Sequence, residues 1–364
     1  MNKLLGTKLR TARENAGLTQ DVLAKAVNLS PEYISLLELG KRSPSLKTLI
    51  RLSDYFKKDL DYFLLEKEDH FSLLLKSEKL GRKEKFLLKK FRKLCQEYIN
   101  LEELTGNRVE PAPLYTRISA GSLAREERRR IGLGNEPLRN VFSLVELNGL
   151  RVIRLWVPEE TPLSGVFLYF DTYQTAFALV NSAQPLGQQA LIAAHEYCHF
   201  LRDRHNGPII DNPDIFIREY VSLYHPREQF AQKFALSFLV PPEKIIEFVG
   251  REIRLKNLRF EDVLFLKHYF GVSTLTMMQV LKELEFLSQD RYEEYRKIDG
   301  LIVEQTVCGE AEEEKRIKRR KKSPLFSSRF RRLAVEAYRK KKISLEKLAA
   351  LLDTDSRQLL TMLK

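Results

Sequence analysis

The segment His-Glu-Tyr-Cys-His at 195–199 has the residue types and the spacing of a metal centre. Histidines four residues apart lie on the same face of a helix, so the imidazoles of His195 and His199 can reach one ion. Glu196 lies beside them and can accept a proton from a water molecule that the ion activates. Apolar flanking residues favour a helix over 188–204. The alternative is a pair of structural histidines at helical spacing.

A catalytic zinc ion takes three protein ligands and keeps one open position, so the two histidines need a third partner. The candidates further along the chain are Glu219, His225 and Glu228. We favour Glu228, because Ala231 and Ala235 share its helical face and would let this helix approach the histidine helix closely. Two imidazoles and a carboxylate suit Zn²⁺, although Mn²⁺ or Fe²⁺ can occupy the same donors.

Residues from about Ala124 to Pro242 resemble the ImmA/IrrE metallopeptidase family of zincin-like peptidases, which cleave repressor proteins. The resemblance is carried by two short β-type runs before the helix, by the histidine motif, and by the segment from Glu228 to Pro241. It implies three zinc ligands, His195, His199 and Glu228, and a catalytic base, Glu196.

Two residues near these ligands depart from the family pattern. Cys198 stands where we expect glycine, and Gln232 stands where we expect asparagine. Neither is a ligand, and a free cysteine usually behaves as a small buried hydrophobe. Other polar residues are weaker candidates with ordinary structural alternatives. They are Tyr220, Tyr224, His225 and His205 for oxyanion stabilisation, and Asp203 and Asp211 for orienting the imidazoles.

Residues 1–65 predict short helices joined by tight turns, in the plan of a helix-turn-helix domain. A helix begins at Gln20, and after a turn Ser30 caps a second helix that starts with Pro31. In this plan the second helix enters the major groove of double-stranded DNA. The residues expected to contact bases or phosphates are Gln20, Ser30, Glu32, Tyr33, Ser35, Lys41 and Arg42.

The segment Leu9–Leu52 resembles the Xre/Cro/phage-repressor type of helix-turn-helix domain. The matching residues include Gly17-Leu18-Thr19-Gln20, Tyr33-Ile34-Ser35 and Gly40-Lys41-Arg42. Helix-turn-helix proteins usually act as dimers on two-fold sites, so a homodimer is plausible. The alternative is a four-helix packing unit that binds a protein partner or never touches DNA.

The net charge of +13 is concentrated in one stretch of the chain. Between Lys315 and Lys342 there are 14 lysine and arginine residues and one acid, Glu336, so the remainder is neutral overall. A smaller excess, nine basic residues against two acids, lies at Lys76–Lys93. Such blocks are typical of surfaces that bind polyanions, most often nucleic acid; a solvated linker is the alternative.

Length and composition predict two or three domains with true hydrophobic cores, because 43% of the 364 residues are hydrophobic. Three scattered cysteines fit a reduced, cytoplasmic setting, and we see no signal peptide or membrane-spanning stretch. The expected fold class is α+β, mainly α with a small β-sheet. The expected domains are a helix-turn-helix domain at 1–65, a charged helical connector at 66–122, a metallopeptidase domain at 123–300, a basic linker at 301–325 and a small helical unit at 326–364.

These features together predict a DNA-binding transcription regulator that is also a zinc-dependent endopeptidase. By the family resemblance, its substrate is a repressor-type regulator, cleaved in a stress or mobile-element response. One alternative is a non-proteolytic Xre-type factor whose peptidase-like domain senses a ligand or partner. Another is an antitoxin-like interaction protein. The intact motif favours the enzyme, because a pure sensor has no need of Glu196.

Overall fold

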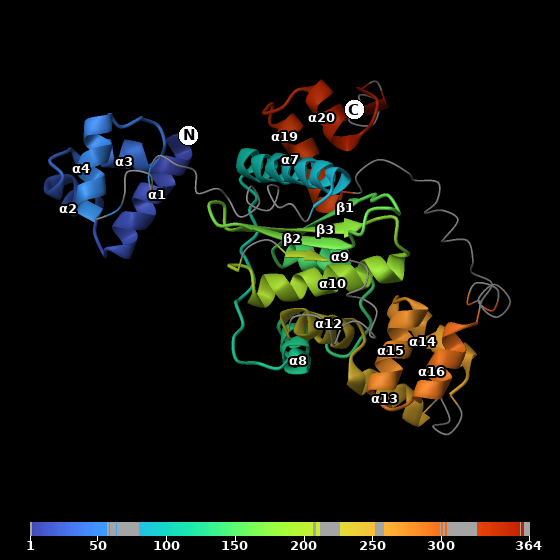
Figure 1. Cartoon of the computed structure of the whole chain (residues 1–364). Coiled ribbons are helices and arrows are strands. Elements are labelled where there is room, and N and C mark those ends of the chain that lie inside the picture. The colour runs from blue at the N-terminus through green and yellow to red at the C-terminus, as the bar shows by residue number, and fades with distance from the viewer. Residues whose placement is uncertain are drawn as a thin grey trace. The chain divides into compact units, whose positions relative to one another are not determined.

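The computed structural model describes residues 2–56, 58, 63, 80–206, 209–211, 226–251, 258–298, 300, 303, 326–356 and 358–359. The chain divides into two compact units, Met1–Glu78 and Lys79–Lys364 (Figure 1). Helices predominate, and one small sheet lies in the second unit, so the expected α+β class is confirmed. Among the helices described, none combines the length and the apolar character needed to cross a bilayer.

Four helices of the first unit pack around a small apolar core. The hydroxyls of Thr19 and Ser30 accept hydrogen bonds from the backbone N–H groups of Val22 and Tyr33, as expected of N-caps. Gly17 has a φ of 68°, which suits the end of a helix. The helices are α1 (Asn2–Asn15), α2 (Gln20–Ala26), α3 (Pro31–Glu38) and α4 (Leu46–Phe56).

A buried carboxylate, that of Glu38, ties three of these helices together. It accepts hydrogen bonds from Arg13 Nε at 2.6 Å and from Gln20 Nε2 at 2.8 Å. Burial alone would raise the pKa of Glu38, but these hydrogen bonds and the charge of Arg13 outweigh burial and lower that pKa. The carboxylate therefore stays ionised and fixes the start of α2 relative to α3.

A four-stranded sheet with the order β1-β3-β2-β4 lies at the centre of the second unit. β1 is parallel to β3, and β2 is antiparallel to both β3 and β4. Helix α10 covers one face of the sheet and helix α7 covers the other (Figure 1). The elements are α7 (Arg82–Thr105), β1 (Leu150–Leu155), β2 (Gly165–Phe170), β3 (Thr175–Asn181), α10 (Leu186–Arg202) and β4 (Ile209–Asp211).

Further helices complete the side of the unit that contains α10. Two of them differ from the sequence prediction. The sequence predicts a helix over Val141–Leu150, but the observed helix ends at Leu147, because Gly149 adopts a φ of 103° and the strand follows at once. The charge-rich α8 was not predicted at all. The helices are α8 (Ala120–Arg130), α9 (Val141–Leu147), α12 (Pro226–Leu239), α13 (Pro242–Arg251), α14 (Phe260–Phe270), α15 (Thr274–Glu283) and α16 (Gln289–Arg296).

The C-terminal helices α19 (Ser328–Arg339) and α20 (Leu345–Leu352) complete the second unit, with α19 packed on α7. Helix α7, which falls in the expected connector, itself packs on β1 and β3. The expected domain limits stay a prediction. Residues 315–322, part of the basic stretch Lys315–Lys342, and the last residues of the expected helical unit, 360–364, lie outside the described residues.

A buried cluster of charges joins α7, β1 and α19. The carboxylate of Glu102 pairs with Arg151, Nη2 to Oε2 at 3.0 Å, and each of these side chains is only 1% exposed. Its other oxygen pairs with Arg329 of α19. Arg329 also donates to the hydroxyl of Tyr98. One carboxylate thus compensates two buried guanidinium groups.

We expect Glu102→Gln to lower the free energy of unfolding by about 3–5 kcal/mol, because it leaves both arginines without their buried counter-charge. The measurement is thermal and urea unfolding of the full chain. Glu103→Gln is the matched control, because the neighbouring Glu103 pairs at the surface with Arg108 and should change stability by less than about 1 kcal/mol. Equal stability of the two variants would contradict this description of the cluster.

Candidate metal centre

Helix α10 presents the two histidines of the motif on one buried face. His195 and His199 are completely buried, and the centroids of their rings lie 4.9 Å apart. The helix is held in place by the sheet on one side and by α12 on the other. The sequence prediction that both imidazoles share one helical face is therefore realised in the structure.

Glu228, in the first turn of α12, reaches both imidazoles. Its Oε2 atom lies 3.2 Å from His195 Nε2 and 3.2 Å from His199 Nε2. One donor atom from each of the three residues lies within 4.8 Å of the other two, which makes them a group that could hold a metal ion. The two other candidate ligands, Glu219 and His225, lie outside the described residues.

The helical face of α12 that carries Glu228 also carries small buried residues. Ala231 and Ala235 of α12 are fully buried, as expected for small residues between two packed helices. Burial alone would raise the pKa of Glu228, but hydrogen bonds from both histidines and their positive charge hold that pKa well below its usual range. The site is thus arranged around an ionised carboxylate.

Glu196 lies against the sheet, next to a glycine of β2. A Cβ atom built on Gly165 would lie only 2.1 Å from Glu196 Oε1. Both the glycine and the carboxylate are buried. Glycine at position 165 is therefore a steric requirement for the observed position of the Glu196 carboxylate.

Of the weaker candidates, Asp203 contacts the site and His205 does not. Asp203 Oδ2 lies 3.2 Å from His199 Nδ1, which can fix the orientation of the imidazole. His205 is half-exposed and pairs with Asp171 at the surface. The side chain of Asp211 and both tyrosines, Tyr220 and Tyr224, are outside the described residues.

Cys198 and Gln232, the two departures from the family pattern, are both buried. Cys198 packs in the main hydrophobic core, and burial raises the pKa of its thiol well above the usual value. This fits the prediction of a small core residue. The side-chain amide of Gln232 forms no hydrogen bond within the described part of the chain.

Sequence reasoning missed a buried network that anchors α10 to α8. The hydroxyl of Tyr197, inside the motif, donates to Glu127 of α8. Glu127 also pairs with Arg130 at 2.6 Å and accepts a hydrogen bond from the hydroxyl of Tyr115. No sequence motif marks Glu127, because two of its partners, Tyr115 and Tyr197, come from segments outside α8.

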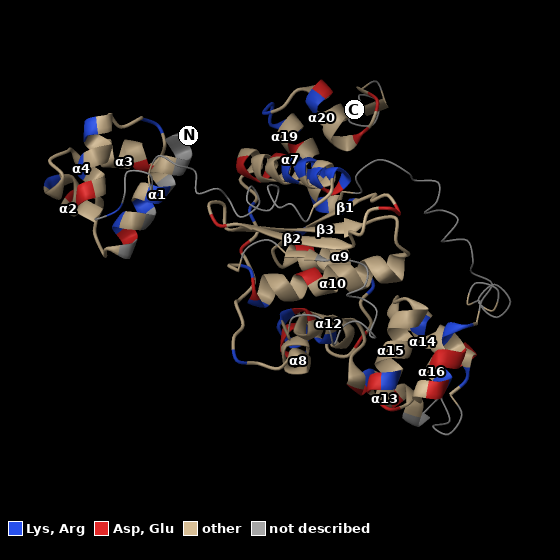
Figure 2. Cartoon of the chain, in the orientation of Figure 1, with Lys and Arg blue, Asp and Glu red and all other residues tan. Residues whose placement is uncertain are grey.

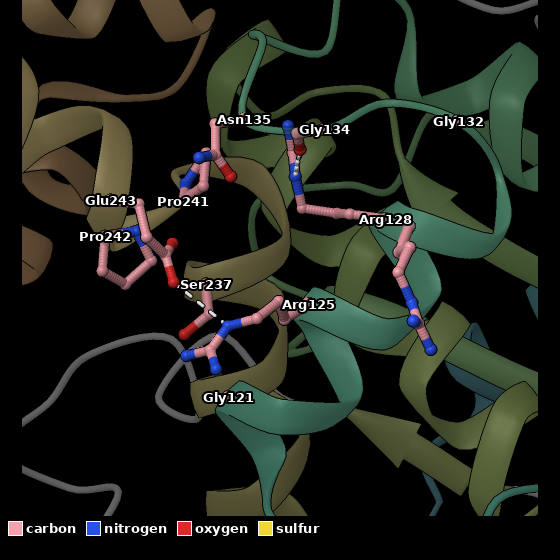
Figure 3. Close-up of a pocket in the computed structure, with 11 residues that line it drawn as sticks. Gly121, Arg125, Arg128, Gly132, Gly134, Asn135, Ser237, Pro241, Pro242 and Glu243 are labelled. Atoms are coloured by element: carbon pink, nitrogen blue, oxygen red, sulfur yellow. Dashed lines mark hydrogen bonds and ion pairs between the residues drawn. The ribbon is translucent and has the colours of Figure 1, made fainter.

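A neighbouring arginine of α8, Arg128, is buried beside a cavity of about 370 Å³ at the end of α12 (Figure 3). It donates to the backbone carbonyls of Gly134, Glu136 and Phe238. Burial lowers its pKa to about 10. The arginine clamps the end of α12 to α8, so both ends of the Glu228 helix are held.

The seven predicted DNA-contact residues lie on α2, α3 and the flanking turns, and all are at least partly exposed. Ser30 caps α3, and Arg42 lies over the ring of Tyr33 at 5.3 Å from the centroid. Ser30, Glu32, Lys41 and Arg42 are exposed. The seven predicted DNA-contact residues are Gln20, Ser30, Glu32, Tyr33, Ser35, Lys41 and Arg42.

Comparison with known proteins finds family models that match segments of both units. A helix-turn-helix family model matches residues 9–63, and a model of the IrrE N-terminal-like domain matches residues 158–282. An uncharacterised helix-turn-helix transcriptional regulator of Archaeoglobus fulgidus is 36% identical over 64 residues, which are 17% of this chain and 91% of that protein. The chain belongs to the helix-turn-helix family. Its second unit carries an IrrE N-terminal-like domain that includes the histidine motif and Glu228.

Other relatives of this helix-turn-helix protein match over short segments. ImmR of Bacillus subtilis is 37% identical over 60 residues, which cover 16% of this chain and 47% of ImmR. PrpR of Mycobacterium tuberculosis is 40% identical over 58 residues, or 16% of this chain and 12% of PrpR. The chain thus spans less than half the length of these two regulators. The crystal structure of ComR from Streptococcus suis aligns with this chain at 11% sequence identity and a TM-score of 0.17. The alignment covers 87% of this chain and 94% of the ComR chain.

We expect Gly165→Ala to displace the Glu196 carboxylate and to lower the free energy of unfolding by about 1–3 kcal/mol, because the added methyl group overlaps Glu196. Gly121→Ala in α8 is the control, because a Cβ atom there meets nothing within 4 Å. The measurement is the thermal unfolding of both variants. A Gly165→Ala protein as stable as Gly121→Ala would show that Glu196 does not occupy this position.

Proposed function

We propose that this chain is a transcription regulator that binds double-stranded DNA through α2 and α3 and hydrolyses peptide bonds at a zinc centre in its second unit. The convergence of His195, His199 and Glu228 carries the enzymatic half of the proposal. A chromosome-bound regulator of this kind acts in the cytoplasm. A repressor-type regulator is the proposed substrate, and a homodimer on a two-fold DNA site is the proposed state.

The three side chains fit a tetrahedral ion. Bonds of about 2.0–2.1 Å from zinc to nitrogen or oxygen place ligand atoms about 3.3 Å apart around a tetrahedron. The Oε2 atom of Glu228 lies 3.2 Å from both Nε2 atoms. The nitrogen and oxygen donors suit zinc, and Mn²⁺ or Fe²⁺ could use the same set.

The residues around these ligands have different roles in peptide hydrolysis. A bound zinc ion would act as a Lewis acid that lowers the pKa of a water molecule and polarises a peptide carbonyl. Glu196 takes a proton from the attacking water and passes it to the leaving amine. Asp203 holds the His199 ring in orientation through Nδ1. The burial of His195 and Glu196 keeps bulk water from competing for these groups.

The first unit supports the DNA-binding half of the proposal. Helix α3 exposes Glu32 at its start, where a recognition helix meets base edges. Lys41 and Arg42 follow the helix and are exposed, as phosphate contacts require. Gln20 is held by Glu38, so its remaining amide oxygen is presented in a fixed orientation.

We expect Glu196→Gln to retain its metal and to lose peptide hydrolysis by about 10²–10⁴-fold, because the amide cannot accept the proton. The measurement is cleavage of a peptide library, read by mass spectrometry, with the zinc content determined on the same samples. Glu243→Gln, at the exposed start of α13, is the control. If Glu196→Gln cleaves as fast as the control, this carboxylate is not the base. If the wild type cleaves nothing while DNA binding persists, the chain is a non-proteolytic regulator.

We expect Glu228→Ala to lower the zinc content from about one ion per chain to a small fraction, because two imidazoles alone bind zinc weakly. The measurement is elemental analysis after dialysis against a weak chelator, with Glu243→Ala as the control. Unchanged zinc in Glu228→Ala would mean that another residue is the third ligand.

A further inference from the structure

The N-terminal half of α7 is the most densely basic segment among the helices described. Residues 82–93 contain seven lysine and arginine residues and one acid, Glu84. Figure 2 shows this concentration of positive charge on α7. The basic residues are Arg82, Lys83, Lys85, Lys89, Lys90, Arg92 and Lys93.

Most of these charges face solvent, because the opposite side of the helix is buried. Leu87, Leu88 and Phe91 pack inward. The basic side chains at 82, 83, 89, 90 and 93 are exposed, and among them Phe86 is 69% exposed. A large exposed aromatic ring within a positive surface is a feature of a binding face rather than of a core.

The charges on this face are largely uncompensated. Within the described parts of the chain, Lys89, Lys90 and Lys93 have no carboxylate within ion-pair distance. Lys83 has a solvent-exposed partner, Glu160, at 3.4 Å. Basic residues elsewhere in this unit are paired more tightly, as in Arg129 with Glu126, Arg130 with Glu127 and Lys347 with Glu97.

This charge pattern is unfavourable for the isolated helix. Like charges four residues apart, as in Lys85 with Lys89 and Lys89 with Lys93, repel each other. Basic residues in the first turn, here Arg82, Lys83 and Lys85, also oppose the helix dipole. A bound polyanion would offset both costs.

We propose that the N-terminal half of α7 binds the phosphate backbone of duplex DNA, as a second and sequence-independent contact beside the helix-turn-helix. The inference rests on the proposed DNA binding of the first unit. Helix α7 begins 25 residues, 57–81, after the end of α4, so DNA held by α3 is present near α7 at a high effective concentration. Exposed lysines act as point charges for phosphate and carry no base preference.

The test compares two full-length triple variants that each remove three exposed cations from the second unit. The affinity for a mixed-sequence 30-base-pair duplex is measured between 50 and 200 mM salt. Circular dichroism melts establish that each variant folds. The α7 variant is Lys89→Gln/Lys90→Gln/Lys93→Gln, and the control variant is Arg139→Gln/Lys233→Gln/Lys297→Gln.

We expect the α7 variant to reduce the magnitude of the negative slope of log K against log salt by about 2–3, since each lost phosphate contact removes about 0.9 from that magnitude. The control variant should keep the wild-type slope. Equal slopes for the two variants would overturn the inference. Binding of the same variants to single-stranded RNA and to phosphatidylserine vesicles is measured as well. If the α7 variant keeps its affinity for duplex DNA but binds either of these more weakly, the inference is also overturned.

A further variant separates this inference from the proposed function. Lys41→Gln/Arg42→Gln removes the two exposed cations after α3 in the first unit. If this variant binds duplex weakly while the α7 variant matches its control, only the inference about α7 fails. If the wild type binds no duplex even at 50 mM salt, the proposed DNA-binding function fails and the inference falls with it.

Discussion

The close contact between α10 and α12 is the constraint on which the candidate metal centre depends. It brings one oxygen of Glu228 within hydrogen-bond distance of two buried imidazoles. A carboxylate with so little exposure is costly unless positive charge or strong donors compensate it. Alanine at 231 and 235 makes the approach sterically available. The chemistry of the site is thus a consequence of helix packing as much as of the histidine motif.

The surrounding residues fix that contact from several directions. Glu127 holds Tyr197 of α10 against α8, and Arg128 holds the far end of α12 through backbone carbonyls. Gly165 leaves the space in which Glu196 lies. On the opposite face of the sheet, Glu102 compensates two buried arginines and joins α19 to α7. Positions of catalytic groups must hold to a fraction of an ångström, and a buried, hydrogen-bonded scaffold provides this.

The sequence predicted the features that depend on local rules. The N-cap at Ser30, the helix that carries both histidines, and the helix on which Glu228 shares a face with Ala231 and Ala235 all follow from spacing and side-chain type. Features that depend on long-range partners were not predictable. Glu127 belongs to a charge-rich helix that has no motif, and two of its partners, Tyr115 and Tyr197, come from outside that helix.

The same distinction explains why α7 looked like a connector. Its basic residues are concentrated in its N-terminal half and mark the segment as charged. Its apolar residues are visible in the sequence, but the strands on which they pack, β1 and β3, are identified only by the structure. Gly165 is another example, because the reason for glycine there is a carboxylate more than 30 residues later in the chain.

The most direct test of the metal centre is a crystal structure of the zinc-loaded protein with anomalous data collected at the zinc edge. We expect a single strong anomalous peak about 2.0–2.2 Å from Nε2 of His195, Nε2 of His199 and a carboxylate oxygen of Glu228. A peak at other residues, or no peak between these three side chains in zinc-saturated crystals, would contradict the proposed centre.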